Sequence, residues 1–272
     1  MKYTEQDLHQ ALDRLALVPD GPERIGYAAA TVTGPARTAK GDRVWVRVGT
    51  VADSVVWMRP DAIEEAAAQL GHRVPMPRLL DSATWDVWDV EEDQARQARA
   101  HVFERVAGSP PSADPALTCA PDVDDTWWKD LRAAHDEIAS AGWAGPGRTA
   151  RRVRRWVAAM AGDRYADVPI TWVPSHCDFH WSNLLSPRLT VLDWEGFSLA
   201  PAGTDAATLL TYSLAVPSVA ARVRDLFSDV LSGDTGQLAL LFAAAEVWTA
   251  VQDGHHPHLA DPLRAHVADL LA

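Results

Sequence analysis

Two hydrophobic periods alternate along the front of the chain. Leucines fall at helical spacing between residues 4 and 17, which predicts an amphipathic helix. Valines fall at every second position between residues 42 and 50, which is the period of a strand. Residues 24–34 and 54–58 also have the composition of strands, and a turn with Gly and Pro follows the first of them. The front of the chain is therefore predicted to be rich in strands.

One helix is predicted among these strands. Pro60 and Asp61 are typical of a helix start, and Asp61 and Glu64 have the spacing of a capping box. An apolar stripe at helical spacing then continues to Leu70. The front of the chain thus combines a sheet with an inserted helix.

The pattern changes after a further pair of extended segments, residues 84–90 and 100–106. A proline-rich stretch follows, and helical spacing then dominates, most clearly in residues 126–141, 148–161 and 236–253. The back of the chain is therefore predicted to be mainly helical.

The change of character near residues 104–108 predicts an α+β protein of two lobes. We expect a strand-rich N-terminal lobe over residues 1–105 and a helical C-terminal lobe over residues 106–272. In proteins of this kind a ligand usually binds where the two lobes meet.

Composition and charge restrict the function classes. The 272 residues are 47% hydrophobic and 23% charged, as in an ordinary soluble globular protein. A net charge of −12 argues against partners such as nucleic acid or anionic membrane; it suits a cationic small molecule, or serves solubility alone. No apolar run approaches the roughly 18 residues of a membrane span. Only Cys119 and Cys177 are present, too few for a disulfide framework, so we expect a reducing, cytoplasmic location.

The strongest chemical signal is the segment HCDFHWSNLL followed by TVLDWEGF. It places His176, Asp178, Asn183 and Asp193 in one short region. Phosphoryl transfer needs a carboxylate that orients or deprotonates the attacking hydroxyl, and oxygen ligands for magnesium on the nucleotide phosphates. Asp178 can be that carboxylate, and Asn183 and Asp193 offer the oxygens. We expect the run LTVLDW, residues 189–194, to form a strand that returns Asp193 to the loop.

This order of residues resembles the aminoglycoside phosphotransferase family, small-molecule kinases with a bilobal protein-kinase-like fold. The resemblance implies that Asp178 is the catalytic carboxylate, that Asn183 and Asp193 bind Mg²⁺, and that His176 buttresses the loop. Cys177 stands where the family usually has glycine, and the segment from Asn183 to Asp193 is short, so it must form a tight hairpin.

Two alternatives use the same residues. His176, Asp178 and Asn183 can satisfy a buried turn with no catalytic role, although their agreement in order and type favours a kinase. His176 and His180 also have the spacing of a zinc-protease helix, but Cys177 occupies the position of its glutamate base. Asp205 resembles a further aspartate of the family, and we expect it to cap the helix that begins there.

The residue that the resemblance implies for binding the nucleotide phosphates is an arginine in place of the usual lysine. The chain has three lysines, and none lies in the strand VWVRVG, where a kinase carries its phosphate-binding lysine. By alignment with the family, Arg47 takes that position, and a guanidinium can bind phosphate in its place. Its partner is Glu65, or Glu64 if the helix is rotated by one residue.

Other nucleotide contacts are implied by the resemblance alone. Backbone amides near Thr33 and Gly34 would lie in a loop over the phosphates. Backbone groups from Glu104 to Val106 would receive the purine of ATP or GTP, which the sequence does not distinguish.

The acceptor is predicted only as a class. The expected function is Mg²⁺-dependent transfer of a nucleotide γ-phosphate to a hydroxyl of a small molecule, with an aminoglycoside-like antibiotic as the leading acceptor and resistance as the outcome. A metabolite kinase and a non-catalytic drug- or nucleotide-binding protein are the alternatives. Trp127, Trp128 and Trp181 either stack on the acceptor or fill the core. The arginines of residues 148–155 either attract an anionic acceptor or form a charged helix face.

Overall fold

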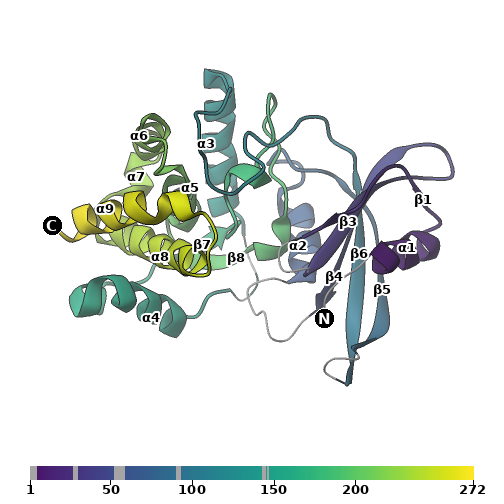
Figure 1. Ribbon diagram of the computed structural model, residues 1–272, viewed down its shortest axis with the longest axis horizontal. Helices are drawn as coiled ribbons and strands as arrows, with labels where there is room; N and C mark the ends of the chain where they lie inside the picture. The colour runs from purple at the N-terminus through teal and green to yellow at the C-terminus, as the bar shows by residue number, and fades with distance from the viewer. Residues whose placement is uncertain (1–4, 27–29, 52–58, 90–92, 143–144, 146) are drawn as a thin grey trace. The chain divides into compact units, whose positions relative to one another are not determined.

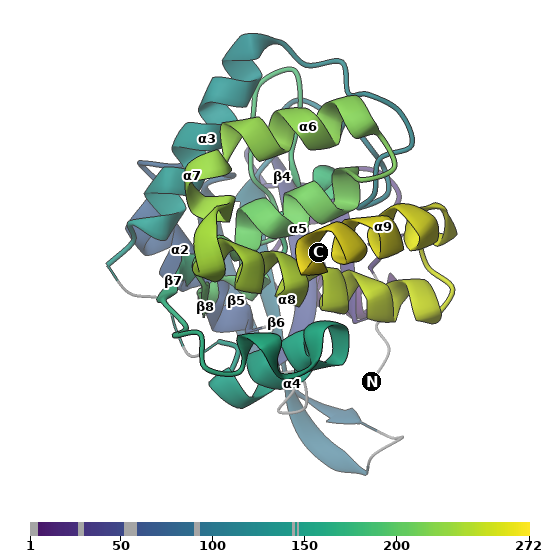
Figure 2. The same cartoon turned by 90° about the vertical axis from the view of Figure 1, so that its left-hand side faces the viewer.

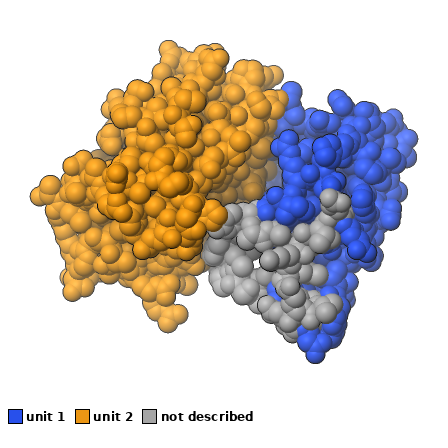
Figure 3. Space-filling model, in the orientation of Figure 1, with its two compact units in different colours: residues 1–71, 77–107 blue, residues 72–76, 108–272 orange. Residues whose placement is uncertain are grey.

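The chain forms two compact units in a computed structural model (Figures 1 and 3). The structure describes all residues except 1–4, 27–29, 52–58, 90–92, 143–144 and 146. Unit 1 comprises Met1–Gly71 and Pro77–Ala107, and unit 2 comprises His72–Met76 and Gly108–Ala272. Residues 72–76 belong to unit 2, partly because the carbonyl of Pro75 accepts a hydrogen bond from the amide of Val191.

Unit 1 is built on an antiparallel sheet, as the hydrophobic alternation predicts. Its strands are β1 (Val18–Pro19), β2 (Arg24–Ile25), β3 (Thr31–Arg37), β4 (Arg43–Val51), β5 (Leu79–Asp89) and β6 (Gln94–Glu104). The order is β1-β3-β4-β6-β5, and β2 also pairs with β3. The predicted strand at residues 54–58 lies outside the described residues.

Helix α1 (Glu5–Arg14) packs on the face of this sheet that carries the alternating valines of β4. Leu8 and Leu12 are buried there against Val46. Because neighbouring strand residues point to opposite faces, Arg47 and its neighbours across the sheet point to the other face. The sheet therefore separates a hydrophobic core from a polar surface.

Helix α2 (Pro60–Leu70) begins two residues earlier than a capping box with Asp61 as the N-cap would allow. Its N-cap is Arg59, and Pro60 takes the first helical position, where its missing N–H is not needed. Asp61 is therefore inside the first turn and makes no cap, so the capping-box prediction is wrong.

Unit 2 is mainly helical (Figure 2). Its α-helices are α3 (Asp125–Ala139), α4 (Ala150–Ala161), α5 (Thr204–Ser213), α6 (Pro217–Leu226), α7 (Ser228–Leu231), α8 (Gly233–Gln252) and α9 (Ala260–Leu271). Short 3₁₀ turns occur at η2 (Gly162–Tyr165), η3 (Trp181–Asn183), η4 (Trp194–Gly196) and η5 (Pro257–Leu259). Strands β7 (Trp172–Ser175) and β8 (Ser198–Pro201) form a separate antiparallel pair. The three long helices predicted for this region are confirmed as α3, α4 and α8.

Helix α8 forms the centre of unit 2. It packs against α4, α5, α7 and α9, and the run Leu238–Ala245 is buried along its whole length. A helix that is apolar on all sides is a core helix. Among the described residues, no helix combines the length and the apolar character needed to cross a membrane.

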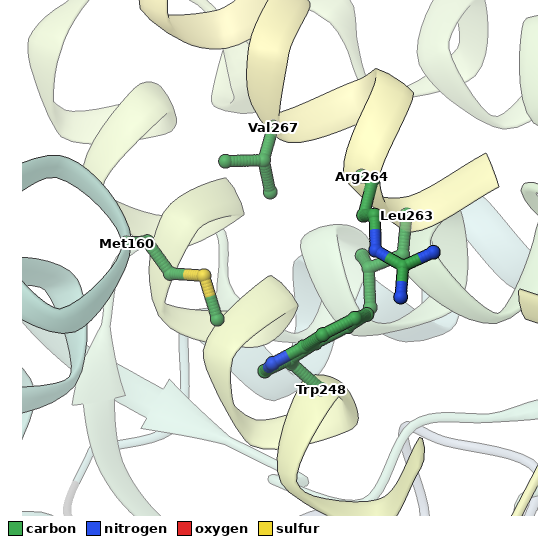
Figure 4. A pocket seen from close by; sticks show the side chains of 5 residues that line it. All are labelled: Met160, Trp248, Leu263, Arg264 and Val267. Atoms are coloured by element: carbon green, nitrogen blue, oxygen red, sulfur yellow. The ribbon is translucent and has the colours of Figure 1, made fainter. Parts of the chain in front are cut away.

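An apolar hollow of about 150 Å³ lies where α4, α8 and α9 meet (Figure 4). Its lining residues are Met160, Trp248, Leu263, Arg264 and Val267. None of these is a predicted site residue, and the guanidinium of Arg264 lies over the Trp248 ring.

The buried imidazole of His266 on α9 makes the stability of unit 2 depend on pH. Burial and the nearby charge of Arg224 lower its pKa to about 4, against an opposing effect of Asp269. Between about pH 6.5 and pH 4 the His266 imidazole is protonated in the unfolded chain but neutral in the folded chain. The free energy of unfolding therefore falls as the pH falls from 6.5 towards 4. We expect wild type to lose about 2 kcal/mol more than His266→Gln between about pH 7 and pH 5, measured by urea unfolding. Equal losses in the two proteins would contradict this assignment.

Candidate active site

The loop after β7 carries the predicted catalytic residues. His176 and Cys177 follow β7 directly, and Asp178 lies between them and the turn η3. Cys177 has a φ of 66°, in the left-handed region that a side chain rarely adopts. Glycine would enter this conformation without steric cost, so a residue with a side chain keeps it only where its neighbours hold the backbone.

Asp205 on α5 holds this backbone. Its Oδ2 accepts from the amide of His176 at 2.7 Å, and its Oδ1 accepts from the amide of Cys177 at 2.8 Å. The prediction that Asp205 caps its helix is wrong: α5 begins at Thr204 after Gly203, so Asp205 lies inside the first turn. Its carboxylate is used by a segment far away in the sequence.

Replacing Asp205 by Ala should destabilise the protein. The substitution leaves two buried N–H groups without acceptors, which should cost about 2–4 kcal/mol of unfolding free energy. Urea unfolding measures this, with Asp225→Ala, an exposed position on α6, as the matched control within about 0.5 kcal/mol of wild type. A loss in Asp205→Ala no larger than in the control would show that the two bonds contribute little.

His176 links the loop to the segment that carries Asp193. Its Nε2 donates to the carbonyl of Leu192 at 2.8 Å, and its Nδ1 accepts from the amide of Asp178 at 3.2 Å. Burial lowers the pKa of His176 despite the nearby charges of Asp205 and Asp178. A neutral imidazole fits this pattern, because one nitrogen donates and the other accepts.

Asp178 is an ionised carboxylate that remains open to solvent. Its side chain is 46% exposed, Nε2 of His180 lies 3.1 Å from its Oδ1, and Nδ2 of Asn183 donates to its Oδ2 at 2.9 Å. Burial would raise the pKa of Asp178, but the His180 pair, His176 and the Asn183 bond hold it well below its usual range. The carboxylate is therefore available as a hydrogen-bond and proton acceptor.

His180 is a contact of Asp178 that sequence reasoning missed. Burial would lower its pKa, but the carboxylates of Asp178 and Asp193 raise it above the usual value. Its other nitrogen, Nδ1, lies 3.1 Å from the hydroxyl of Ser182. The spacing to His176 suggested only a zinc helix, whereas both nitrogens of His176 are engaged with the backbone.

Asn183 and Asp193 lie at the two ends of a tight hairpin, as the short segment requires. The carbonyl of Asn183 accepts from Leu192 at 2.8 Å, and the amide of Leu185 donates to Thr190 at 2.9 Å. Residues 189–194 form an isolated bridge at Val191 instead of the predicted strand. The hairpin is too short to extend the pairing, yet it returns Asp193 to the loop, where its charge acts on His180.

These two residues fit a hard cation. Nδ2 of Asn183 donates to the carbonyl and to Oδ2 of Asp178, which leaves its Oδ1 as the atom that can meet a metal. In the described part of the chain, no group of three or more His, Cys, Asp or Glu could hold a metal. An ion bound by Asn183 and Asp193 would take its remaining ligands from phosphate and water, which suits Mg²⁺.

The polar face of unit 1 carries the predicted cation. Arg47 on β4 lies between Thr33 on β3 and His101 on β6 in the strand register. Nε2 of His101 lies 3.1 Å from Oε1 of Glu64, so α2 contacts this face through Glu64. Burial raises the pKa of Glu64, but His101 and Arg99 lower it below the usual value.

Glu65 makes a different contact. Its two oxygens accept from Nη1 and Nη2 of Arg59 at 3.4 and 2.6 Å. Arg59 precedes the helix and was not considered as a partner from the sequence. The pairing of Arg47 with Glu65 or Glu64 stays a prediction.

The predicted phosphate loop is a strand. Thr33 and Gly34 lie within β3, paired with Arg47 and Val46 of β4. A Cβ on Gly34 would lie 2.8 Å from a terminal methyl of Leu8, so a larger residue here would require the Leu8 side chain on α1 to shift. Contact of Thr33 and Gly34 with phosphate stays a prediction.

The predicted purine segment begins at the end of β6. The amide of Glu104 donates to the carbonyl of Arg78 at 3.0 Å, and its side chain accepts from the amide of Arg78 at 3.1 Å. Val106 follows, half-buried. The role of residues 104–106 toward a purine stays a prediction.

The tryptophans considered for the acceptor fill the core. Trp127, Trp128 and Trp181 are 1%, 4% and 0% exposed. The rings of Trp127 and Trp181 stack at 5.9 Å, and both indole N–H groups have buried acceptors in Leu185 and Ser213. None of the three can stack on an acceptor without rearrangement of this core.

Comparisons with known proteins rest on structure alone. No family model matches the sequence, and no curated protein matches it. A thermostable mutant of aminoglycoside phosphotransferase APH(4)-Ia, solved with ADP and hygromycin B, has a TM-score of 0.63 at 14% identity, covering 98% of this chain and 97% of that one. Amicoumacin kinase hAmiN, solved with AMP-PNP, Ca²⁺ and Ami, has a TM-score of 0.59 at 13% identity, covering 99% and 92%.

A choline/ethanolamine kinase family protein from Mesorhizobium loti has a TM-score of 0.54 at 15% identity, covering 97% and 94%. These neighbours are similar to the chain over nearly its whole length. The chain therefore has a kinase-like α+β fold. The predicted resemblance is confirmed at this level: the fold is that of the aminoglycoside phosphotransferases.

Proposed function

We propose that this protein is a Mg²⁺-dependent phosphotransferase that moves the γ-phosphate of ATP or GTP to a hydroxyl of a small molecule. The observation that carries the proposal is the ionised, solvent-open carboxylate of Asp178, hydrogen-bonded to Asn183, with the charge of Asp193 close by. Carboxylate, amide oxygen and second carboxylate are the groups that phosphoryl transfer needs.

Each predicted residue has a proposed role. Asn183 and Asp193 would hold Mg²⁺, which when bound neutralises charge on the phosphates. Arg47 would bind phosphate, supported by Glu65 or Glu64. Thr33 and Gly34 would contact phosphate through their backbone, and residues 104–106 would receive the purine.

Asp178 would act on the acceptor. Its carboxylate would accept a hydrogen bond from the acceptor hydroxyl, orient the oxygen and take its proton as the new bond to the γ-phosphorus forms. The bond from that phosphorus to the oxygen shared with the β-phosphate breaks, and the nucleoside diphosphate leaves. His176 would hold the loop next to the segment that carries Asp193, because its Nε2 donates to the carbonyl of Leu192. His180 lies against Oδ1 of Asp178 and favours its ionised form.

The acceptor we propose is a hydroxylated antibiotic, cationic and aminoglycoside-like, phosphorylated in the cytoplasm with resistance as the result. Support comes from the net charge of −12, which suits a cationic ligand, and from structural neighbours solved with hygromycin B and with Ami.

The test is nucleotide consumption by the purified protein with Mg²⁺ across an acceptor panel. The panel holds hygromycin B, amicoumacin, other aminoglycosides, macrolides, choline, ethanolamine and sugars, each with ATP and with GTP. We expect turnover with at least one antibiotic, and growth protection against that antibiotic on expression. Turnover with a metabolite and no protection would identify a metabolite kinase, and nucleotide binding without turnover on any compound would favour a binding protein.

A further inference from the structure

An ion pair between a buried arginine and a half-buried glutamate in unit 2 lies directly against the candidate catalytic loop. Nε and Nη2 of Arg148 donate to the two carboxylate oxygens of Glu246 on α8 at 3.1 and 3.2 Å. Nη2 of Arg148 also donates to the carbonyl of Cys177 at 3.3 Å. For the arginines of residues 148–155, the sequence suggested either attraction of an anionic acceptor or a charged helix face. The Arg148 side chain is 4% exposed, so neither applies to it.

The carbonyl that Arg148 contacts belongs to the strained residue before Asp178. The amide of Cys177 is held by Asp205 on α5, and its carbonyl by Arg148, so both sides of the left-handed residue are fixed. A non-glycine residue keeps such a conformation only where its surroundings impose it. The two contacts therefore determine the direction in which the chain enters Asp178.

Stability alone does not explain the ion pair. Removing the Arg148 charge and most of the Glu246 side chain from water is costly, and apolar residues of similar size are often equally stable or more so. Nη1 of Arg148 is also buried with no hydrogen-bond partner in the part of the chain that the structure describes, which adds to the cost. An ion pair with this cost, next to the strained backbone of Cys177, indicates a role in conformation.

We propose that Arg148 and Glu246 are positioning residues that hold the Cys177 peptide and so orient Asp178. The consequence for turnover rests on the proposed phosphotransferase function, whereas the consequence for loop order does not. The pair fixes the carbonyl of Cys177; Arg148 itself does not touch the reacting groups.

The decisive variant is Arg148→Met combined with Glu246→Leu, made in a Cys119→Ser background. The double replacement removes both charges at once, so we expect urea unfolding at or above the wild-type midpoint. Turnover should fall by about 10- to 100-fold in kcat with KM for the nucleotide nearly unchanged, because misplacement of Asp178 affects the chemical step. Arg155→Met, an exposed arginine of α4, is the matched control.

Cys177 provides a second readout that needs no activity. Its thiol is buried, whereas Cys119 is exposed and is removed in the background. Burial raises the pKa of the Cys177 thiol to about 12, so labelling by a thiol reagent requires the loop to open. We expect labelling of Cys177 to be at least about tenfold faster in the double variant at unchanged global stability.

The results distinguish the positioning role of the Arg148–Glu246 pair from the proposed phosphotransferase function. Wild-type labelling and wild-type kcat in a stable double variant would overturn the proposal. If no acceptor is found and the phosphotransferase function fails, the labelling rate still decides whether the pair orders the loop. If the double variant does not fold, Arg148→Lys decides by the same readouts, since it keeps the charge beside Glu246 but loses the planar fork that reaches both partners.

Discussion

Replacing Asp178 by Asn should lower kcat by about 10³-fold while the protein remains folded. The amide cannot take the proton of the acceptor hydroxyl, and loss of a positioned base typically costs 10²- to 10⁴-fold. Folding should persist because the side chain is nearly half exposed and the substitution preserves its shape. Steady-state turnover with the acceptor found in the panel measures the effect.

The control for this substitution is Asp167→Asn, an exposed aspartate of unit 2 outside the loop. It should keep wild-type kcat. Turnover within about threefold of wild type in Asp178→Asn would mean that Asp178 is not the base, because even the weakest general-base contribution exceeds this factor.

The second large effect is expected for Asp193→Ala. Removing this carboxylate leaves Asn183 as the only proposed protein ligand for Mg²⁺, and metal stabilisation of transferred charge is worth several kcal/mol. We expect kcat to fall by at least about 10²-fold and the Mg²⁺ concentration for half-maximal activity to rise by about tenfold or more. A Mg²⁺ titration of turnover measures both.

Asp225→Ala serves as the control for Asp193→Ala, since Asp225 is exposed on α6. A lower kcat with an unchanged Mg²⁺ requirement would mean that Asp193 has a structural role and does not bind the metal. Asn183→Ala should raise the Mg²⁺ requirement in the same direction, because its Oδ1 is the other proposed ligand.

Local patterns in the sequence predicted most of the secondary structure. The alternation of Val44, Val46 and Val48 places one face of β4 against α1, and this periodicity depends only on neighbouring residues. The hydrophobic pattern predicts a strand at Thr33 and Gly34, whereas the resemblance implies a loop. They lie in strand β3, whose Val32 and Ala36 pack under α1. Glycine there accommodates Leu8, which no local rule reveals.

The spacing of the loop motif predicted which residues meet, but not what holds them. His176, Asp178 and Asn183 gather because few residues separate them. Asp205, by contrast, bonds the amide of a residue 29 positions earlier. Glu246 lies 98 positions from Arg148.

Such distant contacts follow from helix packing, which a single sequence does not specify. The same limit applies to Arg59, whose bond to Glu65 depends on where α2 begins, and the helix starts at Pro60 instead of using Asp61 as a cap. Local sequence patterns thus predict which residues share the loop more readily than they predict the distant residues that hold it in place.

The most direct test of the proposed function is the mass of the acceptor after incubation with the protein, Mg²⁺ and nucleotide. Hygromycin B and the rest of the panel are each analysed with wild type and with Asp178→Asn, using ATP and GTP separately. The proposed function predicts a mass gain of one phosphate group on an acceptor with wild type, and its loss with Asp178→Asn. Equal phosphorylation by the two proteins, or none on any compound despite measurable nucleotide binding, would contradict it.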